Sequence, residues 1–265
     1  METRVAMGQE TSVINHGEGQ IEGRNAVVEA LRSSIDIDKV FIVKNDTDSI
    51  IKYIASTARA AGAVVVEADR RKLDSMSTTQ SHQGVIAIAA YTKYVTIGDL
   101  LVSAKKKGEE PLIILCDEIS DPHNLGAIIR TCDAAGAHGV IIPKRRSAGQ
   151  SATVVKASGG ALFHTAIARV SNMTSAIKEL KKSGVWVFAA SADAEKSLWE
   201  SDFTCAAALV IGSEGAGISR LVSENCDYKI RIPMNGELSS LNASVSAAVI
   251  LYEAVRQRRK CSISS

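Results

Sequence analysis

The chain has 265 residues, of which 46% are hydrophobic and 23% charged, and its formal net charge at pH 7 is +2. This length and apolar content suit one large domain or two modest ones with real cores, and we expect two domains. No run of about 18 uncharged apolar residues exists, because Glu253 interrupts the richest stretch, so the sequence excludes a membrane-spanning helix.

Residues 1–19 contain acidic residues and glycines but no apolar core of the signal-peptide type. We interpret them as a flexible tail, whose role the sequence does not reveal. The five cysteines form an odd set without a C-x-x-C pair, which argues against a disulfide framework and a zinc site. We therefore expect a cytoplasmic protein. The histidines are scattered without ligand spacing, so we expect no metal site.

Residues 20–92 alternate between amphipathic and strand-like segments and predict a small α/β domain. The expected order is an amphipathic stretch GRNAVVEALRSS, strand KVFIV, a helix-like segment SIIKYIASTARAAG, strand AVVVEA, a short helix around residues 71–75, and strand GVIAIAA. Residues 93–110 follow, with three consecutive lysines and the sequence GEEP at their end, and are interpreted as a short helix plus a linker. We place the domain boundary in this segment.

Residues 111–260 contain strands that are uninterrupted apolar runs, namely LIILC, GVIIP, VWVFAA, ALVIG and KIRIP. Such strands, separated by helices, are typical of a parallel sheet covered on both faces, so we expect a doubly wound α/β domain. Ligands of these sheets bind beyond the carboxyl ends of the strands. The residues that follow each strand are therefore the candidates for a functional site.

Strand LIILC leads into a helix with Asp121 as the expected N-cap and Pro122 as its first residue. Arg130 lies on the face opposite the apolar one. Two interpretations stand at this point. The segment holds either an exposed arginine with a capping Asn124, or an amide and a guanidinium that bind a phosphate or position a hydroxyl.

Strand ALVIG leads into SEGAGIS, which places three glycines around Glu214. Glycines permit positive φ and close approach of a ligand to the backbone, so this loop is compatible with nucleoside binding and equally with a helix-capping turn. Its spacing differs from the dinucleotide fingerprint, and no G-x-x-x-x-G-K-[ST] motif exists. Both absences argue against an oxidoreductase or phosphoryl-transfer enzyme on an ordinary doubly wound sheet.

Strand KIRIP leads into MNGELSSLNASV and then a long helix. One side of this helix carries Val245, Ala248, Val249, Tyr252 and Val255, whereas Ile250 and Leu251 lie outside that stripe. A helix that is apolar on more than one face needs more than one partner. We expect a core on one side and a second subunit on the other, with burial inside one chain as the alternative.

Three linked motifs run through residues 112–259: D-x-x-x-D-P-x-N-x-G-x-x-x-R, I-G-x-E-G-x-G and I-P-M-x-G-x-x-x-S-L-N-x-S-V. In this order they resemble the motifs of the SpoU (TrmH) family of RNA ribose 2′-O-methyltransferases. The resemblance implies an α/β fold with a deep trefoil knot near the C-terminus. It also implies S-adenosylmethionine as the cofactor and a homodimer packed through the knotted region.

The resemblance also assigns site residues. The expected catalytic residues are Arg130, Asn124, Glu214, Ser240 and Asn242, and the expected cofactor-binding residues are Ser191, Ala192, Gly212, Ile232 and Leu241. The resemblance implies that Arg130 acts on the ribose hydroxyl or the adjacent phosphate, with general base as the role proposed in the family. Orientation and oxyanion stabilisation are an equally good physical account, because a guanidinium holds its proton too tightly to be a good base. Glu214 is expected to hold Asn242 or Arg130 in place.

Residues 20–92, with IEGRNAVVEAL at their start and SHQGVIAI near their end, resemble the RNA-binding domain of the subgroup that methylates a guanosine ribose in 23S ribosomal RNA. The expected RNA-binding residues are Arg24, Lys144, Arg145 and Arg146. Methylation of transfer RNA and an inactive RNA-binding protein are the alternatives. The sequence identifies neither the nucleotide nor whether the substrate is free RNA or a ribosome-assembly particle.

Overall fold

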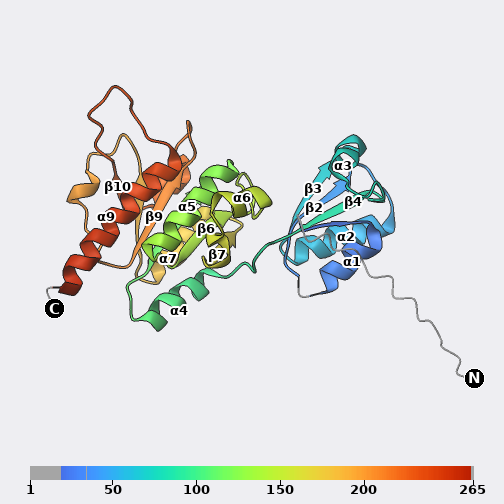
Figure 1. Cartoon of the computed structure of the whole chain (residues 1–265), viewed down its shortest axis with the longest axis horizontal. Helices are drawn as coiled ribbons and strands as arrows, with labels where there is room; N and C mark the ends of the chain where they lie inside the picture. Colours follow the sequence, from blue (N-terminus) through green and yellow to red (C-terminus); the bar gives the residue numbers. More distant parts are fainter. Residues whose placement is uncertain (1–18, 34, 264–265) are drawn as a thin grey trace, which may run out of the picture. The chain divides into compact units, whose positions relative to one another are not determined.

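The computed structural model describes residues 19–33 and 35–263, with side chains described as far as Arg259. The tail expected at residues 1–19 lies outside the described residues, apart from Gly19. The chain divides into two compact units, Met1–Ala90 and Tyr91–Ser265, which we describe one at a time (Figure 1). Among the described helices, none combines the length and the apolar character that crossing a membrane requires.

The N-terminal unit is a four-stranded sheet with helices on both faces (Figure 1). Its elements are β1 (Gln20–Glu22), α1 (Arg24–Arg32), β2 (Ile37–Val43), α2 (Ser49–Ala60), β3 (Val64–Ala68), α3 (Arg70–Met76) and β4 (Val85–Ala89). Helices α1 and α2 pack on one face, whereas Leu73 of α3 packs against Ile86 on the other. The predicted small α/β domain is confirmed, and only β1 was not predicted because three residues carry no readable period.

The strand directions bring four chain segments to one edge of this sheet. The order is β1-β4-β2-β3, with β2 and β3 parallel and β4 antiparallel to both β1 and β2. Strands β1, β2 and β3 therefore end at the same edge, where β4 begins. The start of α1, the turn after β2, the start of α3 and the loop before β4 all lie there.

Residues 93–110, interpreted from the sequence as a short helix plus a linker, contain helix α4 (Ile97–Lys107). Thr96 and Asp99 form a capping box at its start. Ile97 and Leu100 are buried in the core of the C-terminal unit, so this helix is part of that unit and not a free connection. The run of lysines after Ala104 favoured a linker, because the apolar face of this helix is too short to be recognised beside it.

The C-terminal unit is built on a six-stranded sheet in the order β10-β8-β9-β5-β6-β7, in which every pair is parallel. Its strands are β5 (Leu112–Asp117), β6 (Gly139–Pro143), β7 (Ile167–Val170), β8 (Trp186–Ala190), β9 (Ala207–Gly212) and β10 (Tyr228–Ile230). Its further helices are α5 (Pro122–Ala135), α6 (Ala152–Ala157), α7 (Met173–Lys182), α8 (Arg220–Asn225) and α9 (Ala243–Ile263). All five predicted strands are present, and β7 was missed because it is short and contains Arg169.

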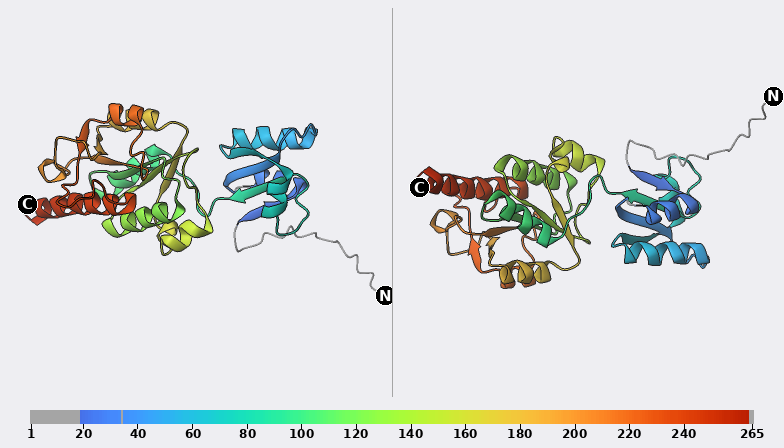
Figure 2. Two further views of the ribbon diagram at one scale, coloured as in Figure 1. Left: turned by 90° about the horizontal axis from the view of Figure 1, so that it is seen from above. Right: turned by 90° about the horizontal axis from the view of Figure 1, so that it is seen from below.

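Both faces of this sheet are covered, which confirms the predicted doubly wound architecture. Helices α5, α6 and α9 share one hydrophobic core with the sheet, and α4, α7 and α8 share the other. Figure 2 shows α5 and α9 on one side of the strands and α7 and α8 on the opposite side. Continuous apolar strands such as β5, whose six residues are all buried, are the consequence of this double cover.

The long helix α9 is apolar on two sides, as predicted. Its core face consists of Ala247, Ile250, Leu251 and Ala254, all nearly inaccessible. Of the stripe noted in the sequence, Val245 is 47% exposed and Tyr252 is 50% exposed, whereas Val249 is partly buried against the core. Within the described residues, the apolar face that includes Tyr252 is left without a covering element.

Candidate functional site

A cavity of about 1090 Å³ lies beyond the carboxyl ends of the neighbouring strands β10, β8 and β9. Its walls are the loops that follow these strands. All five expected cofactor residues and three expected catalytic residues line it, namely Ser191, Ala192, Gly212, Ile232 and Leu241, and Glu214, Ser240 and Asn242. Sequence reasoning therefore placed these eight residues at one site.

The glycine-rich loop after β9 is folded tightly on itself. A Cβ atom added to Gly212 would lie 2.1 Å from the carbonyl carbon of Gly217, so only glycine fits there. Gly217 has a φ of +68°, in the left-handed region that favours glycine. The loop ends at Ser219, whose side chain makes no capping hydrogen bond to α8. The glycines thus serve the turn that forms the cavity wall, and not a serine cap.

Three polar side chains from distant segments form a hydrogen-bonded cluster at this wall. The Asn124 amide nitrogen donates to Glu214 Oε1 at 2.9 Å, and the Asn242 amide nitrogen donates to Asn124 Oδ1 at 3.0 Å. Asn242 also donates to Glu214 Oε1 through a short contact. Glu214 therefore holds Asn242, as one of the two expected arrangements proposed, and its described hydrogen bonds do not include Arg130.

The caps of helices α5 and α9 explain why the amide nitrogens of Asn124 and Asn242 can donate to Glu214. Asp121 caps α5 by accepting from the His123 N–H at 3.0 Å, so Asn124 is not a capping residue, and its side chain is buried in the first turn. Asn242 caps α9 with its oxygen, which accepts from the Ser244 N–H at 2.9 Å. Its amide nitrogen is thereby turned toward Glu214.

Arg130 lies on α5, exposed, on the face opposite its core residues, as the helical spacing predicted. It makes no hydrogen bond or ion pair with any residue that the structure describes, and it is absent from the cavity lining. Its guanidinium lies beside Gly159, since a Cβ atom added there would be 3.8 Å from Arg130 Cζ. An uncommitted guanidinium remains available to a phosphate or a ribose oxygen.

The expected RNA-binding residues lie in two places. Lys144, Arg145 and Arg146 follow β6, at the same carboxyl edge as the cavity and separated from β9 by β5 alone. Arg145 and Arg146 are both exposed, and Arg146 pairs with Glu118 at 3.2 Å. Arg24 belongs to the N-terminal unit, where its guanidinium donates to Asp48 at 2.6 Å.

Sequence reasoning missed several polar residues of the cavity region. Arg220, Glu224 and Lys229 line the cavity. Asp117 is 3% exposed, and its Oδ2 accepts from the Ser219 N–H at 2.8 Å, which fixes the far end of the glycine loop. Asp117 is the first aspartate of the D-x-x-x-D-P motif, and the signal for its role was a carboxylate at the end of an otherwise apolar strand. No cluster of three metal-ligating side chains occurs among the described residues.

Comparison with known proteins places this geometry in a family. Residues 111–252 match the sequence model described as "SpoU rRNA Methylase family", and residues 20–95 match "RNA 2'-O ribose methyltransferase substrate binding". A relative in Bacillus subtilis (strain 168), named putative TrmH family tRNA/rRNA methyltransferase YacO, is 44% identical over 236 residues, which cover 89% of this chain and 94% of the relative.

Solved structures show the same likeness. The SpoU methyltransferase AviRb from Streptomyces viridochromogenes, in complex with the cofactor AdoMet, superimposes with a TM-score of 0.59 at 27% identity, covering 96% of this chain and 95% of AviRb. The TrmH/SpoU tRNA modifying enzyme of A. aeolicus gives a TM-score of 0.53 at 33% identity and covers 58% of this chain and 78% of that enzyme.

Proposed function

The chain belongs to the SpoU rRNA methylase family, and on this premise we propose that it transfers a methyl group from S-adenosylmethionine to the ribose 2′-hydroxyl of a guanosine in 23S ribosomal RNA. The enzyme class, an RNA methyltransferase that uses S-adenosylmethionine, follows from the family. The observation that carries methyl transfer to a ribose is the Asn124–Glu214–Asn242 cluster at the wall of a large cavity, and the choice of RNA is argued below from the N-terminal unit.

The cavity fits S-adenosylmethionine in size and in chemistry. Its volume of about 1090 Å³ exceeds what a molecule of this size needs, and its lining is rich in glycine, alanine and serine, which expose backbone groups. We assign the adenosine part to the backbone at Gly212, Ile232 and Leu241, with Ser191 and Ala192 beside it. When bound, the cofactor supplies a methyl group already activated by the sulfonium charge.

The residues of the chain then have to place the ribose 2′-oxygen in line with the sulfonium methyl group, and the hydroxyl proton passes to solvent water as the new C–O bond forms. Well-oriented groups lower a barrier by about 7 to 11 kcal/mol, so positioning accounts for much of the catalysis. We assign Arg130 to the 2′-oxygen or the neighbouring phosphate, where its charge stabilises a developing oxyanion. Asn124, Asn242 and Ser240 set the geometry by hydrogen bonds, and Glu214 fixes both asparagines.

Ribosomal RNA is favoured over transfer RNA by the N-terminal unit. Residues 20–95 match a substrate-binding description, and a solved structure named as an rRNA methyltransferase, from Sinorhizobium meliloti, aligns with 91% of the chain at 27% identity and a TM-score of 0.58. The A. aeolicus tRNA modifying enzyme aligns with only 58% of it. Transfer RNA is the second candidate, because the B. subtilis relative is named for both RNA classes.

Mass spectrometry of ribose methylation tests the proposal. The full-length protein and S-adenosylmethionine are incubated separately with unmodified 23S ribosomal RNA, a ribosome-assembly particle and transfer RNA, with Arg130→Ala as the control. We expect one methylated guanosine in 23S RNA, which the control lacks. Methylation of transfer RNA alone contradicts the assigned substrate, and no product on any RNA contradicts the assigned activity.

The outer face of α9 supports a homodimer, because Val245 and Tyr252 are about half exposed. Exposed apolar stripes of this kind mark protein interfaces. We expect a dimer at micromolar concentration in light scattering, and Tyr252→Asp to convert it to a monomer, whereas Tyr53→Asp, on α2, leaves it dimeric. A monomeric wild type contradicts this assignment.

We further propose that the C-terminal segment forms the trefoil knot that the family resemblance implies. The support is the convergence of the loops after β8, β9 and β10 on one cavity. A cytoplasmic location is proposed with the RNA substrate and is tested by cell fractionation.

A further inference from the structure

A second cavity lies in the N-terminal unit, at the edge where β1, β2 and β3 end and β4 begins. Its volume is about 390 Å³, and it is lined by Arg24, Val43, Asp46, Arg70, Gln83 and Gly84. The size lies in the range of small-molecule pockets, and the carboxyl ends of parallel strands such as β2 and β3 are where ligands of open sheets bind. Nothing in the methyl-transfer site uses these residues.

The charged side chains of this pocket differ in how many of their polar atoms already have hydrogen-bond or ion-pair partners. Arg24 is fixed, because its guanidinium donates to Asp48 at 2.6 Å and to the Gln83 carbonyl at 3.1 Å. Asp46 accepts from the Asp48 N–H through Oδ1 at 2.9 Å, while its Oδ2 has only a 4.0 Å contact with Arg24. Arg70, exposed at the start of α3, makes no hydrogen bond or ion pair with a described residue. A carboxylate oxygen and a guanidinium are thus left for a ligand.

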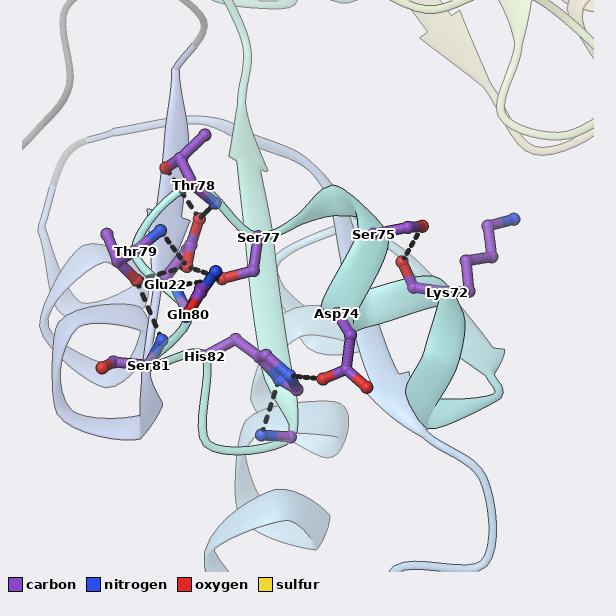
Figure 3. Close-up of polar contacts among 11 residues, drawn as sticks. Glu22, Lys72, Asp74, Ser75, Ser77, Thr78, Thr79, Gln80, Ser81 and His82 are labelled. Carbon is purple, nitrogen blue, oxygen red and sulfur yellow. Dashed lines mark hydrogen bonds and ion pairs between the residues drawn. The ribbon is translucent and has the colours of Figure 1, made fainter.

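The loop of residues 77–84, which carries Gln83, is anchored at its first half by one carboxylate (Figure 3). Glu22 accepts from the Ser77 hydroxyl at 2.5 Å, the Thr78 N–H at 2.7 Å and the Thr79 hydroxyl at 2.5 Å. Burial opposes ionisation of Glu22, but these hydrogen bonds together outweigh it and hold the pKa of its carboxyl well below the usual range. The anchor is therefore ionised at neutral pH.

The second half of the loop is anchored by His82, which is 4% exposed. Its Nδ1 accepts from the Gly84 N–H at 3.0 Å, so the proton resides on Nε2, which donates to Asp74 at 2.9 Å (Figure 3). Between these contacts Gln83 has a φ of +50°, a conformation that few side chains other than Asn and Asp adopt readily. The two anchors hold the exposed Gln83 amide at the pocket, where its oxygen accepts from the Arg24 N–H at 3.2 Å.

We propose that this pocket binds one unpaired nucleotide of the substrate RNA, with its phosphate on Arg70 and its base against Gln83 and Asp46. A free anion does not suit the pocket, because the Asp46 carboxylate repels it. A nucleotide supplies both an anionic phosphate and base N–H donors for that carboxylate. Proteins read RNA chiefly through unstacked bases in loops and bulges. The inference rests on the proposed function for its substrate class, and on the substrate-binding match of residues 20–95.

Filter binding of the full-length protein to in vitro transcribed 23S ribosomal RNA, at several salt concentrations, tests the pocket. We expect Arg70→Ala and Gln83→Ala each to weaken binding roughly tenfold. Arg70→Ala also lowers the salt slope by about 0.7 to 0.9, as loss of one phosphate contact does, whereas Gln83→Ala leaves the slope unchanged. Arg71→Ala is the matched control, because Arg71 is an exposed neighbour on α3 outside the pocket.

Equal losses for Arg70→Ala and Arg71→Ala, or unchanged binding by Gln83→Ala, overturn the pocket and leave only a generally basic surface. Wild-type protein that binds neither 23S RNA nor transfer RNA overturns it as well. Methylation is measured in parallel on the same RNA. Binding that depends on Arg70 and Gln83 without any methylation upholds the pocket and contradicts the proposed function, so the two failures are distinguishable.

Discussion

The two cavities of this protein are lined by different kinds of chemical group. Glycine, alanine and serine and their backbone groups line much of the cavity in the C-terminal unit, whereas Arg24, Asp46, Arg70 and Gln83 line most of the pocket in the N-terminal unit. Recognition by backbone tolerates exchange of side chains, and recognition by side chains does not. The difference suits the two ligands that we propose, a fixed cofactor in the C-terminal unit and RNA of a particular sequence in the N-terminal unit.

The largest effect is expected for Arg130, the side chain on which catalysis in the C-terminal unit is proposed to depend. Arg130→Ala should lower the methylation turnover by about 100- to 1000-fold, the usual loss when a group that stabilises developing charge is removed. Affinity for S-adenosylmethionine, measured by calorimetry, should stay within a factor of two. Arg130→Lys tests whether the guanidinium itself is required, and full turnover by that variant contradicts the assigned role.

Glu214→Gln should lower turnover by about 10- to 100-fold, because the carboxylate that accepts from Asn124 and Asn242 is replaced by a weaker acceptor and misaligned positioning residues are costly. The KM for RNA should change much less than kcat. Glu237→Gln, an exposed position in the loop before α9, serves as the matched control. An equal effect of both substitutions on kcat refutes the positioning role.

Glu22→Gln tests whether the Glu22 carboxylate holds the loop of residues 77–84 in the N-terminal unit. The folded-state pKa of Glu22 lies below its ordinary value of 4.5, so its ionised form stabilises the fold above that pH, and this contribution is lost as pH falls through the folded-state value. We expect the variant to be about 2 kcal/mol less stable at pH 7, and less so in acid. The readout is urea unfolding of the full chain.

The exposed Glu29, which pairs with Arg32 at 3.2 Å, provides the control for this measurement. Glu29→Gln should change the free energy of unfolding by less than about 1 kcal/mol, since exposed ion pairs contribute little. A Glu22→Gln variant as stable as Glu29→Gln at neutral pH would show that the loop is not held by this carboxylate.

The smallest effect is expected for a side chain of the backbone-lined cavity. Ser191→Ala should weaken S-adenosylmethionine binding by less than about threefold, because the Ser191 hydroxyl already donates to Asp193 and the net worth of one hydrogen bond is small. Calorimetric titration measures this directly. A loss above tenfold would mean that this cavity also recognises its ligand by side chains.

Sequence reasoning succeeded where a residue's neighbours in the chain define its place. The buried strands of the C-terminal unit follow from their apolar runs, and the cavity wall from the linked motifs that contain Asn124, Glu214 and Asn242. It predicted the short helix within residues 93–110 but interpreted it as part of a linker, since the lysine run concealed the short apolar face that packs into the core. It also missed the N-terminal pocket, because Asp46, Arg70 and Gln83 come from three segments that only the strand order brings together.

The central claim is that the C-terminal unit carries out catalysis and the N-terminal pocket recognises RNA. It is tested most directly by kcat and KM for 23S ribosomal RNA, measured for the wild type, Arg130→Ala and Arg70→Ala. We expect Arg130→Ala to lose kcat with little change in KM. We expect Arg70→Ala to raise KM roughly tenfold while it keeps most of the turnover at saturating RNA. The same pattern of losses in both variants would contradict separate sites for catalysis and for RNA recognition.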